Sequence, residues 1–90
     1  MLDIVSSNRF KKDLKLAIKR GYSITLLDDV VNKLAMQKPL EGRYKDHELT
    51  GDFKGFRECH ITPDWLLIYQ IIDNALILYL SRTGTHSDLF

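Results

Sequence analysis

Two long apolar runs separated by Asp73-Asn74 constrain the fold of this chain more than any other feature of its sequence. Residues 65–72 and 75–83 are nearly continuously apolar, which predicts two strands that are buried on both faces. Asp and Asn tolerate positive φ, so Asp73-Asn74 predicts a tight two-residue turn that joins these strands into a hairpin. Helices are then needed to cover at least one face of the hairpin.

The first half of the chain supplies two candidate helices. The first is expected between the N-cap residues at 6–8 and Gly21, with helical spacing of the apolar residues Phe10, Leu14, Ala17 and Ile18. The second begins after Ser23 and ends before Pro39, with an apolar face made of Ile24, Leu27, Val30, Val31 and Leu34. Both helices are amphipathic, so they predict an antiparallel pair that packs on apolar strands.

Two further strands complete the predicted architecture. Residues 2–5 form a short apolar run before the helices, and residues 56–62 have the composition of a strand before the hairpin. Residues 39–51 are polar and irregular, and a loop of this length favours a functional role. The predicted fold is α+β with the order β-α-α-β-β-β, in which a helical hairpin packs on an antiparallel sheet.

The expected hairpin turn also predicts which side chains share a face of the sheet. A two-residue turn places Ile72 opposite Ala75 and Trp65 opposite Arg82. His60 and Glu58 would join the face of Trp65 and Arg82, but Pro63 has a φ fixed at about −65° and cannot take a turn position that needs positive φ. A bulge or a wider loop is therefore expected near Pro63.

Length and composition limit the class of protein. Ninety residues predict one domain, residues 1–90, with one modest core. No apolar run approaches the roughly 20 residues of a membrane-spanning helix, and no signal peptide is expected at the N-terminus. Cys59 is the only cysteine, so an internal disulfide is excluded and a reducing, cytoplasmic location is expected.

The net charge is only +1, yet the first helical segment is strongly basic. It contains one acidic residue, Asp13, among Arg9, Lys11, Lys12, Lys15, Lys19 and Arg20. A basic segment of this kind suits contact with a polyanion. A solvated helix face explains the same pattern equally well.

Three histidines, His47, His60 and His86, lie in the second half of the chain beside carboxylates and predicted turns. Imidazole has an unperturbed pKa of about 6.5, so it takes and gives protons at neutral pH. A nucleophilic displacement at phosphorus requires both transfers, with cations to stabilise the phosphate. These residues, together with Asp64, are therefore candidates for acid–base chemistry.

Each candidate also has a structural explanation. His60 is explained by hydrogen bonding within a sheet, and His86 by a solvated tail. His47 and Asp64 suit turns, and Trp65 suits a core as well as a stacking platform. Arg57 and Arg82 are explained by packed stems with solvated heads.

A metal site is the competing chemical hypothesis. Three histidines and Asp64 are possible zinc ligands, but the chain has no His-Glu-x-x-His and no Cys-x-x-Cys. Cys59 and His60 are adjacent on a predicted strand, so they point to opposite faces. The spacing therefore argues against a metal, and no cofactor is expected.

Three blocks of sequence, in this order, resemble one known family, the YafQ branch of the RelE/ParE toxins. The first is Tyr-Lys-Asp-His-Glu-Leu-Thr-Gly at 44–51, and the second is Gly-Phe-Arg-Glu-Cys-His-Ile-Thr-Pro-Asp-Trp-Leu-Leu-Ile-Tyr at 55–69. The third is Arg-Thr-Gly-Thr-His-Ser-Asp-Leu-Phe at 82–90, at the end of the sequence. Residues 1–43 agree with the family in layout only.

The resemblance implies a RelE-like fold and a toxin of a type II toxin–antitoxin pair that cuts translated mRNA in the ribosomal A site. It implies that His86 is the general acid, that His60 and Asp64 supply or position the base, and that His47 completes the cleft. The 2′-hydroxyl of the RNA would be the nucleophile, without metal. It further implies that Arg82 stabilises phosphate charge and that Phe90 packs near a base, and Trp65 and Arg57 are candidates for further substrate contacts.

The implied partners are the ribosome, mRNA and a cognate antitoxin that folds on binding. Binding of operator DNA by the antitoxin is a further expectation. No membrane is expected to be involved. In this setting the basic residues Lys11, Lys12, Lys15, Lys19 and Arg20 are candidates for contacts with ribosomal RNA. Two alternatives remain open, a ParE-like inhibitor of DNA gyrase and a binding module without catalysis.

Overall fold

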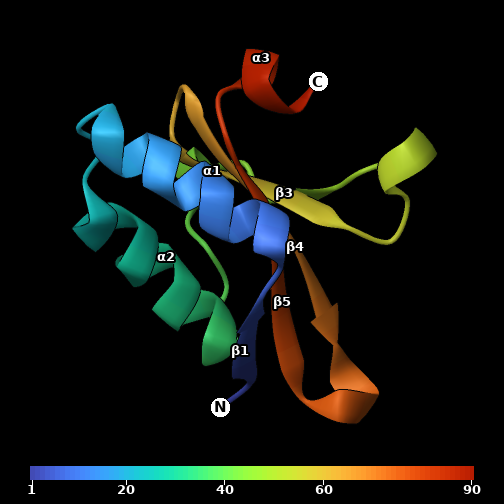
Figure 1. Cartoon of the computed structure of the whole chain (residues 1–90). Helices are drawn as coiled ribbons and strands as arrows, with labels where there is room; N and C mark the ends of the chain where they lie inside the picture. The colour runs from blue at the N-terminus through green and yellow to red at the C-terminus, as the bar shows by residue number, and fades with distance from the viewer.

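The computed structural model describes residues 1–90, with five strands, three α-helices and three short 3-10 turns (Figure 1). The strands are β1 (Asp3–Ser6), β2 (His47–Glu48), β3 (Arg57–Thr62), β4 (Trp65–Ile72) and β5 (Ile77–Gly84). The helices are α1 (Asn8–Lys19), α2 (Ile24–Ala35) and the single turn α3 (His86–Leu89). The 3-10 turns are η1 (Gly42–Tyr44), η2 (Gly51–Phe53) and η3 (Asp73–Ala75).

The strands form one sheet in the order β1-β5-β4-β3-β2, which confirms the predicted α+β fold. All neighbouring strands are antiparallel except β1, which runs parallel to β5 at one edge. The opposite edge is β2, a strand that was not expected within the loop of residues 39–51. Two residues are too few to show an alternating pattern, so sequence periodicity does not reveal β2.

Both predicted helices form where their caps and apolar spacing place them. The Ser7 hydroxyl accepts a hydrogen bond from the Phe10 N–H at 2.9 Å, and Gly21 after α1 adopts a φ of +81°. The apolar face expected for α1 included Ile18, but Ile18 is 56% exposed, so the buried face is narrower than predicted. Helix α1 contacts the sheet mainly along β5, so only a narrow stripe containing Phe10 and Ala17 is buried.

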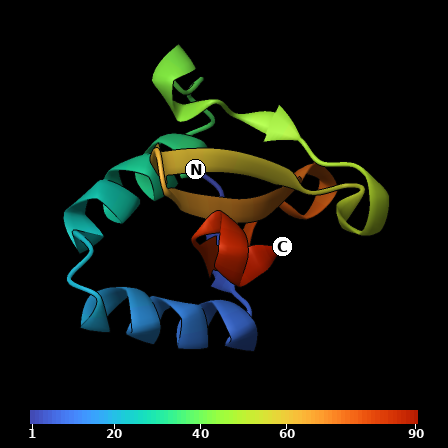
Figure 2. The same ribbon diagram turned by 90° about the horizontal axis from the view of Figure 1, so that it is seen from above.

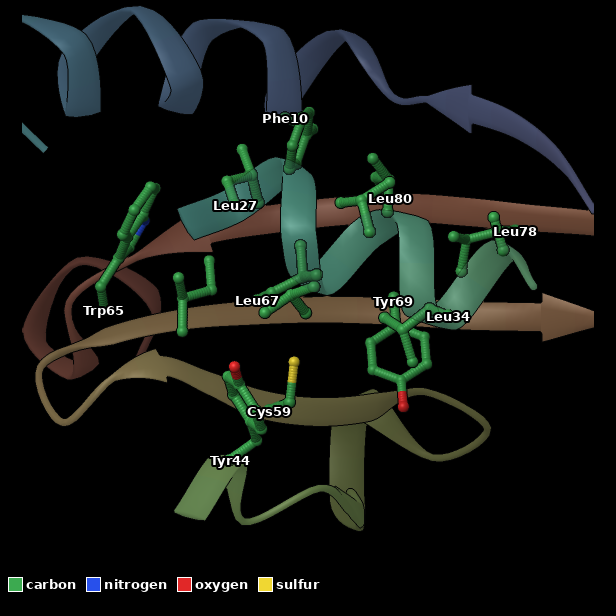
Figure 3. Close-up of a cluster of buried hydrophobic side chains, with 14 of the residues drawn as sticks. Phe10, Leu27, Leu34, Tyr44, Cys59, Trp65, Leu67, Tyr69, Leu78 and Leu80 are labelled. Carbon is green, nitrogen blue, oxygen red and sulfur yellow. The ribbon is translucent and has the colours of Figure 1, made fainter. Parts of the chain in front are cut away.

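The helices and the sheet enclose the main core. Figures 1 and 2 show α1 and α2 beside the sheet and α3 at the end where β5 stops. Sixteen buried residues form this core, and Figure 3 shows many of their side chains between α2 and the strands. Trp65, Leu67 and Tyr69 point into it from β4. The opposite face of β4 carries Leu66 and Ile68, which pack with Leu89 of α3 in a smaller cluster.

The prediction of a two-residue turn at Asp73-Asn74 is wrong. η3 and Leu76, which has a φ of +54°, form a four-residue loop, so Ile72 pairs with Ile77 instead of Ala75. A bulge then shifts the pairing again between Leu80 and Arg82. Arg82 therefore lies opposite Ile68 and not opposite Trp65.

The irregularity expected near Pro63 is confirmed as a bulge. His60 pairs with Leu66, while Thr62 pairs with Trp65, so the register shifts between His60 and Thr62. His60 consequently lies on the face of Leu66, and Trp65 lies on the core face. The expectation that Trp65 shares a face with His60 and Arg82 is therefore wrong, because the turn and the two bulges change the register.

Candidate active site

Glu58 of β3 lies between two of the predicted catalytic histidines. Its carboxylate oxygen Oε1 is 3.6 Å from His47 Nε2 and 3.7 Å from His60 Nε2. Glu58 and His60 are two residues apart on β3, so their side chains lie on one face, and His47 faces Glu58 from β2. The Glu58 residue is only 6% exposed, so its charge acts in a partly desolvated position between the two rings.

Backbone carbonyls orient both rings. His47 Nδ1 lies 2.6 Å from the Lys45 oxygen, and His60 Nδ1 lies 3.2 Å from the Pro63 oxygen. A carbonyl oxygen only accepts hydrogen bonds, so Nδ1 is the nitrogen that carries a proton in each of these contacts, and a ring in that tautomer keeps its lone pair on Nε2. Both rings therefore present a potential proton acceptor near Glu58.

His60, Asp64 and His86 line one cavity of about 310 Å³ at the end of the sheet. His60 comes from β3, Asp64 from the turn between β3 and β4, and His86 from α3. The cavity also contains Thr85 and Ser87, so polar groups converge on it from both sides. The structure thus gathers three of the four predicted catalytic residues, and His47 is linked to them through Glu58.

α3 is fixed at both its start and its outer side. The Thr85 hydroxyl accepts from the Asp88 N–H at 3.2 Å, while Asp88 accepts from the Thr85 N–H at 2.9 Å, which is a capping box. Asp88 also accepts two hydrogen bonds from Arg20. The Arg20 guanidinium and the Thr85 N–H hold the pKa of Asp88 far below its usual range.

Aromatic rings connect His86 to a loop on the same side of the sheet. The ring of Phe90 lies against His86 with centroids 5.0 Å apart and an angle of 32°. Phe53 of η2 meets Phe90 edge to face at 5.4 Å. Phe90 remains half exposed beside His86, as the predicted contact with a base requires.

Two of the predicted substrate-binding residues are not available on this face. Trp65 is 2% exposed and packs in the main core against Tyr22, with ring centroids 5.0 Å apart. Arg57 lies opposite Tyr69, on the core face, where its Nε is 3.3 Å from Asp46. The register of β3 and β4 turns both side chains away from the histidines.

Some of the basic residues predicted to contact RNA or phosphate form ion pairs within the protein, and the others do not. Arg82 donates from Nε and Nη2 to Asp13 of α1 at 2.7 and 3.2 Å, and Arg20 is paired with Asp88. The other four basic residues predicted to contact RNA are all exposed on α1 and make no ion pair, namely Lys11, Lys12, Lys15 and Lys19. The basic surface is therefore a lysine surface.

Glu58 and Phe53 are the site residues that sequence reasoning missed. Glu58 had a signal, because its spacing of two from His60 on a predicted strand places both side chains on one face. Phe53 had none, because its contact with Phe90 joins residues 37 positions apart through two irregular segments. The assembled groups are equipped for proton transfer, because two ring nitrogens lie near a buried carboxylate and a third histidine lines the same cavity as His60.

A helical pair on a five-stranded sheet, with histidines and carboxylates around a cleft beside α3, defines a RelE-like toxin. The family model described as "Bacterial toxin of type II toxin-antitoxin system, YafQ" matches residues 2–90. The chain belongs to the YafQ family of bacterial toxins.

Relatives of known sequence and structure agree with this assignment. The mRNA interferase toxin YafQ of Escherichia coli strain K12 is 44% identical over 89 residues, which cover 98% of this chain and 95% of the relative. A crystal structure of a metal-bound toxin from Helicobacter pylori is 51% identical, covers 100% of both chains and has a TM-score of 0.95. YafQ in the crystal structure of the E. coli DinJ-YafQ toxin-antitoxin complex is 43% identical, with coverage of 99% and 97% and a TM-score of 0.88.

The structure bears on the predictions that no metal and no membrane are involved. No group of three or more His, Cys, Asp and Glu side chains is arranged to hold a metal ion. None of the helices has the length and apolar character needed to cross a membrane. Reaction without metal stays a prediction.

Proposed function

We propose that this chain is an mRNA interferase, a ribosome-dependent endoribonuclease that cuts translated mRNA in the A site. The observation that carries the proposal is the convergence of His60, Asp64 and His86 on one cavity. The name of the E. coli relative, mRNA interferase toxin, supports the same activity.

In the proposed reaction, the Nε2 lone pair of His60 or His47 accepts the proton of an RNA 2′-hydroxyl. The 2′-oxygen attacks phosphorus, and the bond from phosphorus to the 5′-oxygen breaks. The products are a 2′,3′-cyclic phosphate and a 5′-hydroxyl. Glu58 favours the protonated ring that this transfer creates, because its carboxylate lies 3.6 and 3.7 Å from the two Nε2 atoms.

His86 is proposed as the general acid that gives a proton to the departing 5′-oxygen. It lines the same cavity as His60 and Asp64 but comes from a different element, α3, which suits a substrate held between acid and base. Phe90 supports this role because its half-exposed ring lies next to His86 and offers a face for a base.

Arg82 is proposed to stabilise the phosphate although it is paired with Asp13. Guanidinium has five N–H donors, and Asp13 takes two of them, which leaves three. Asp13 also accepts from the Thr83 N–H at 3.2 Å, so it holds Arg82 and the backbone of β5 together beyond the residues that pair with β1. Arg82 would therefore approach the phosphate with a fixed orientation.

The lysine surface of α1 is proposed to contact ribosomal RNA, since phosphate contacts need no sequence recognition. We further propose that residues 1–90 act as one cytoplasmic toxin domain whose partner is a cognate antitoxin, as DinJ is for E. coli YafQ.

Primer extension on programmed ribosomes tests the proposed function. The protein is incubated in EDTA with ribosomes that carry a defined codon in the A site, and the mRNA ends are mapped. Cleavage within that codon by the wild type is expected, with a loss of about 10²- to 10⁴-fold in His86→Ala, the range that general acid catalysis contributes. Absence of cleavage, equal cleavage by His86→Ala, or cleavage only after metal is restored would contradict the proposal.

A further inference from the structure

Asp46 immediately precedes His47 but points to the other side of the sheet. His47 faces Glu58 on the side of the cavity, whereas Asp46 reaches Tyr69 and Arg57 on the core face. His47 therefore lies on the side of the proposed chemistry, whereas Asp46 lies on the opposite side of the sheet and is kept away from RNA bound at the cavity.

The strand that carries His47 is weakly held by its own backbone. β2 has two residues, lies at the edge of the sheet and is exposed along its length. It pairs with β3 through His47 with Glu58 and through Glu48 with Arg57, and one further backbone hydrogen bond runs from the Leu49 N–H to the Phe56 oxygen at 2.9 Å. A strand this short needs side-chain contacts to keep one position, because two pairs of residues offset little conformational entropy.

Asp46 supplies those contacts. Its Oδ1 accepts a hydrogen bond from the Tyr69 hydroxyl at 2.5 Å and one from Arg57 Nε at 3.3 Å. Tyr69 is 1% exposed in the middle of β4, and Figure 3 shows its hydroxyl pointing out of the core cluster toward β3. Burial, and then the bond to Asp46, raise the pKa of Tyr69, so the hydroxyl remains a donor.

The same segment determines which nitrogen of His47 carries the proton. Lys45 has a left-handed backbone with a φ of +48°, and its carbonyl accepts from His47 Nδ1 at 2.6 Å. Asp46 is the single residue between this carbonyl and this ring. Fixing Asp46 on the core face therefore fixes the angle between them.

We propose that Asp46, clamped by Tyr69 and Arg57, is a positioning residue that orients His47 and keeps its Nε2 free for the proposed proton transfer. The inference rests on the proposed function for its effect on cleavage, but its structural part concerns His47 alone. It also assigns Arg57, predicted to bind substrate, to a support role on the opposite face.

Two measurements test the proposal on the same variants. Long-range ¹H–¹⁵N spectra of the histidine rings report which His47 nitrogen is protonated, and steady-state cleavage at several concentrations of programmed ribosomes gives kcat and KM. Tyr69→Phe removes only the hydroxyl, Asp46→Ala removes the acceptor, and Asp46→Asn keeps an oxygen at the same place. Glu48→Ala is the matched control, because Glu48 is also acidic and contacts Arg57 at 3.6 Å but has no bond to Tyr69.

Tyr69→Phe and Asp46→Ala are expected to give a mixture of His47 tautomers and a kcat lower by about tenfold to hundredfold, as for a misplaced catalytic group. KM should change by less than about threefold, since the substitutions leave the contacts that bind the ribosome and the mRNA before reaction unchanged. Asp46→Asn should recover part of the loss, and Glu48→Ala should resemble the wild type. Circular dichroism verifies folding, and if Asp46→Ala is unfolded, Tyr69→Phe and Asp46→Asn decide the outcome.

A single His47 tautomer with unchanged kcat in Tyr69→Phe and either Asp46 variant would overturn the proposal, as would equal losses in Glu48→Ala. If the wild type does not cleave at all, the proposed function fails. The ring spectra then still decide whether Asp46 orients His47.

Discussion

The guanidinium of Arg20 holds the carboxylate of Asp88 through two hydrogen bonds, from Nη1 at 2.6 Å and from Nη2 at 3.2 Å. Arg20 follows α1, and Asp88 belongs to α3, which also carries His86. A single helical turn does not hold itself in place, because four residues are below the length at which a helix is stable alone. The position of His86 therefore depends on a contact between two distant parts of the sequence.

Arg20→Ala is expected to loosen α3 and to lower cleavage about tenfold, because a displaced acid transfers its proton less effectively. Amide hydrogen exchange of residues 86–89 measures the loosening, and single-turnover cleavage measures the rate. Lys38→Ala is the control, since Lys38 is an exposed cation outside α1 that makes no ion pair. Equal effects of the two variants would show that only surface charge matters.

The contact between Arg20 and Asp88 should weaken only in acid. The pKa of Asp88 is well below its usual range in the folded protein, through the Arg20 bond first and then the Thr85 N–H. A carboxyl with a lowered folded pKa stabilises the fold above its unfolded pKa of about 3.9, and the contribution is lost as pH falls below that value. The chemical shift of the Asp88 side-chain carboxyl carbon should therefore stay constant from about pH 7 to pH 4 and change only below it, and the amide carbon of Asp88→Asn should lack this transition.

Glu58→Gln is expected to lower cleavage by about tenfold to hundredfold without loss of stability. The variant keeps the shape of the side chain but removes the charge that faces His47 and His60. The partners of Glu58 are histidines, which can lose their protons, so the substitution leaves no charge buried without a partner. Urea unfolding and single-turnover cleavage separate the two effects, and Glu41→Gln, on an exposed acidic residue, is the control. Cleavage at the wild-type rate would mean that the two histidines act without Glu58.

Cys59 is expected to resist thiol reagents in the folded protein. It is fully buried in the main core, and burial is the first cause that raises the pKa of its thiol to about 12. Because the thiolate is the reactive form, iodoacetamide at about pH 8 should label it only after unfolding in urea. Rapid labelling without denaturant would indicate that β3 opens locally.

Reversal of charge at Lys11, Lys12, Lys15 and Lys19 is expected to weaken association with ribosomes while the fold is kept. Each phosphate contact that is lost should reduce the salt dependence of association, with a slope change of about one for each contact. Sedimentation with ribosomes at several salt concentrations measures this slope. Arg20 is left unchanged in this variant because it holds Asp88. Association that is unaltered at every salt concentration would exclude the lysine surface.

The local pattern of the sequence determined which elements form and which residues are candidates for chemistry. The apolar spacing and caps predicted α1 and α2, and the apolar runs predicted β4 and most of β5, because these signals depend on neighbours in the chain. The histidines and Asp64 were recognisable from residue type and from three blocks of sequence that resemble the family and occur in the same order.

The partners of the charged and aromatic residues were decided only by the tertiary structure. A four-residue loop at 73–76 and the bulge before Arg82 moved that residue from Trp65 to Ile68, since a shift of one residue in register turns a side chain to the other face. Arg20 pairs with Asp88, which lies 68 positions away in the sequence, and the carboxylate partner of Arg57 lies 11 positions away. Local sequence carries no record of such contacts, because they form only when distant segments meet, and this is why Asp46 and Asp88 were identified as supports of the site only in three dimensions.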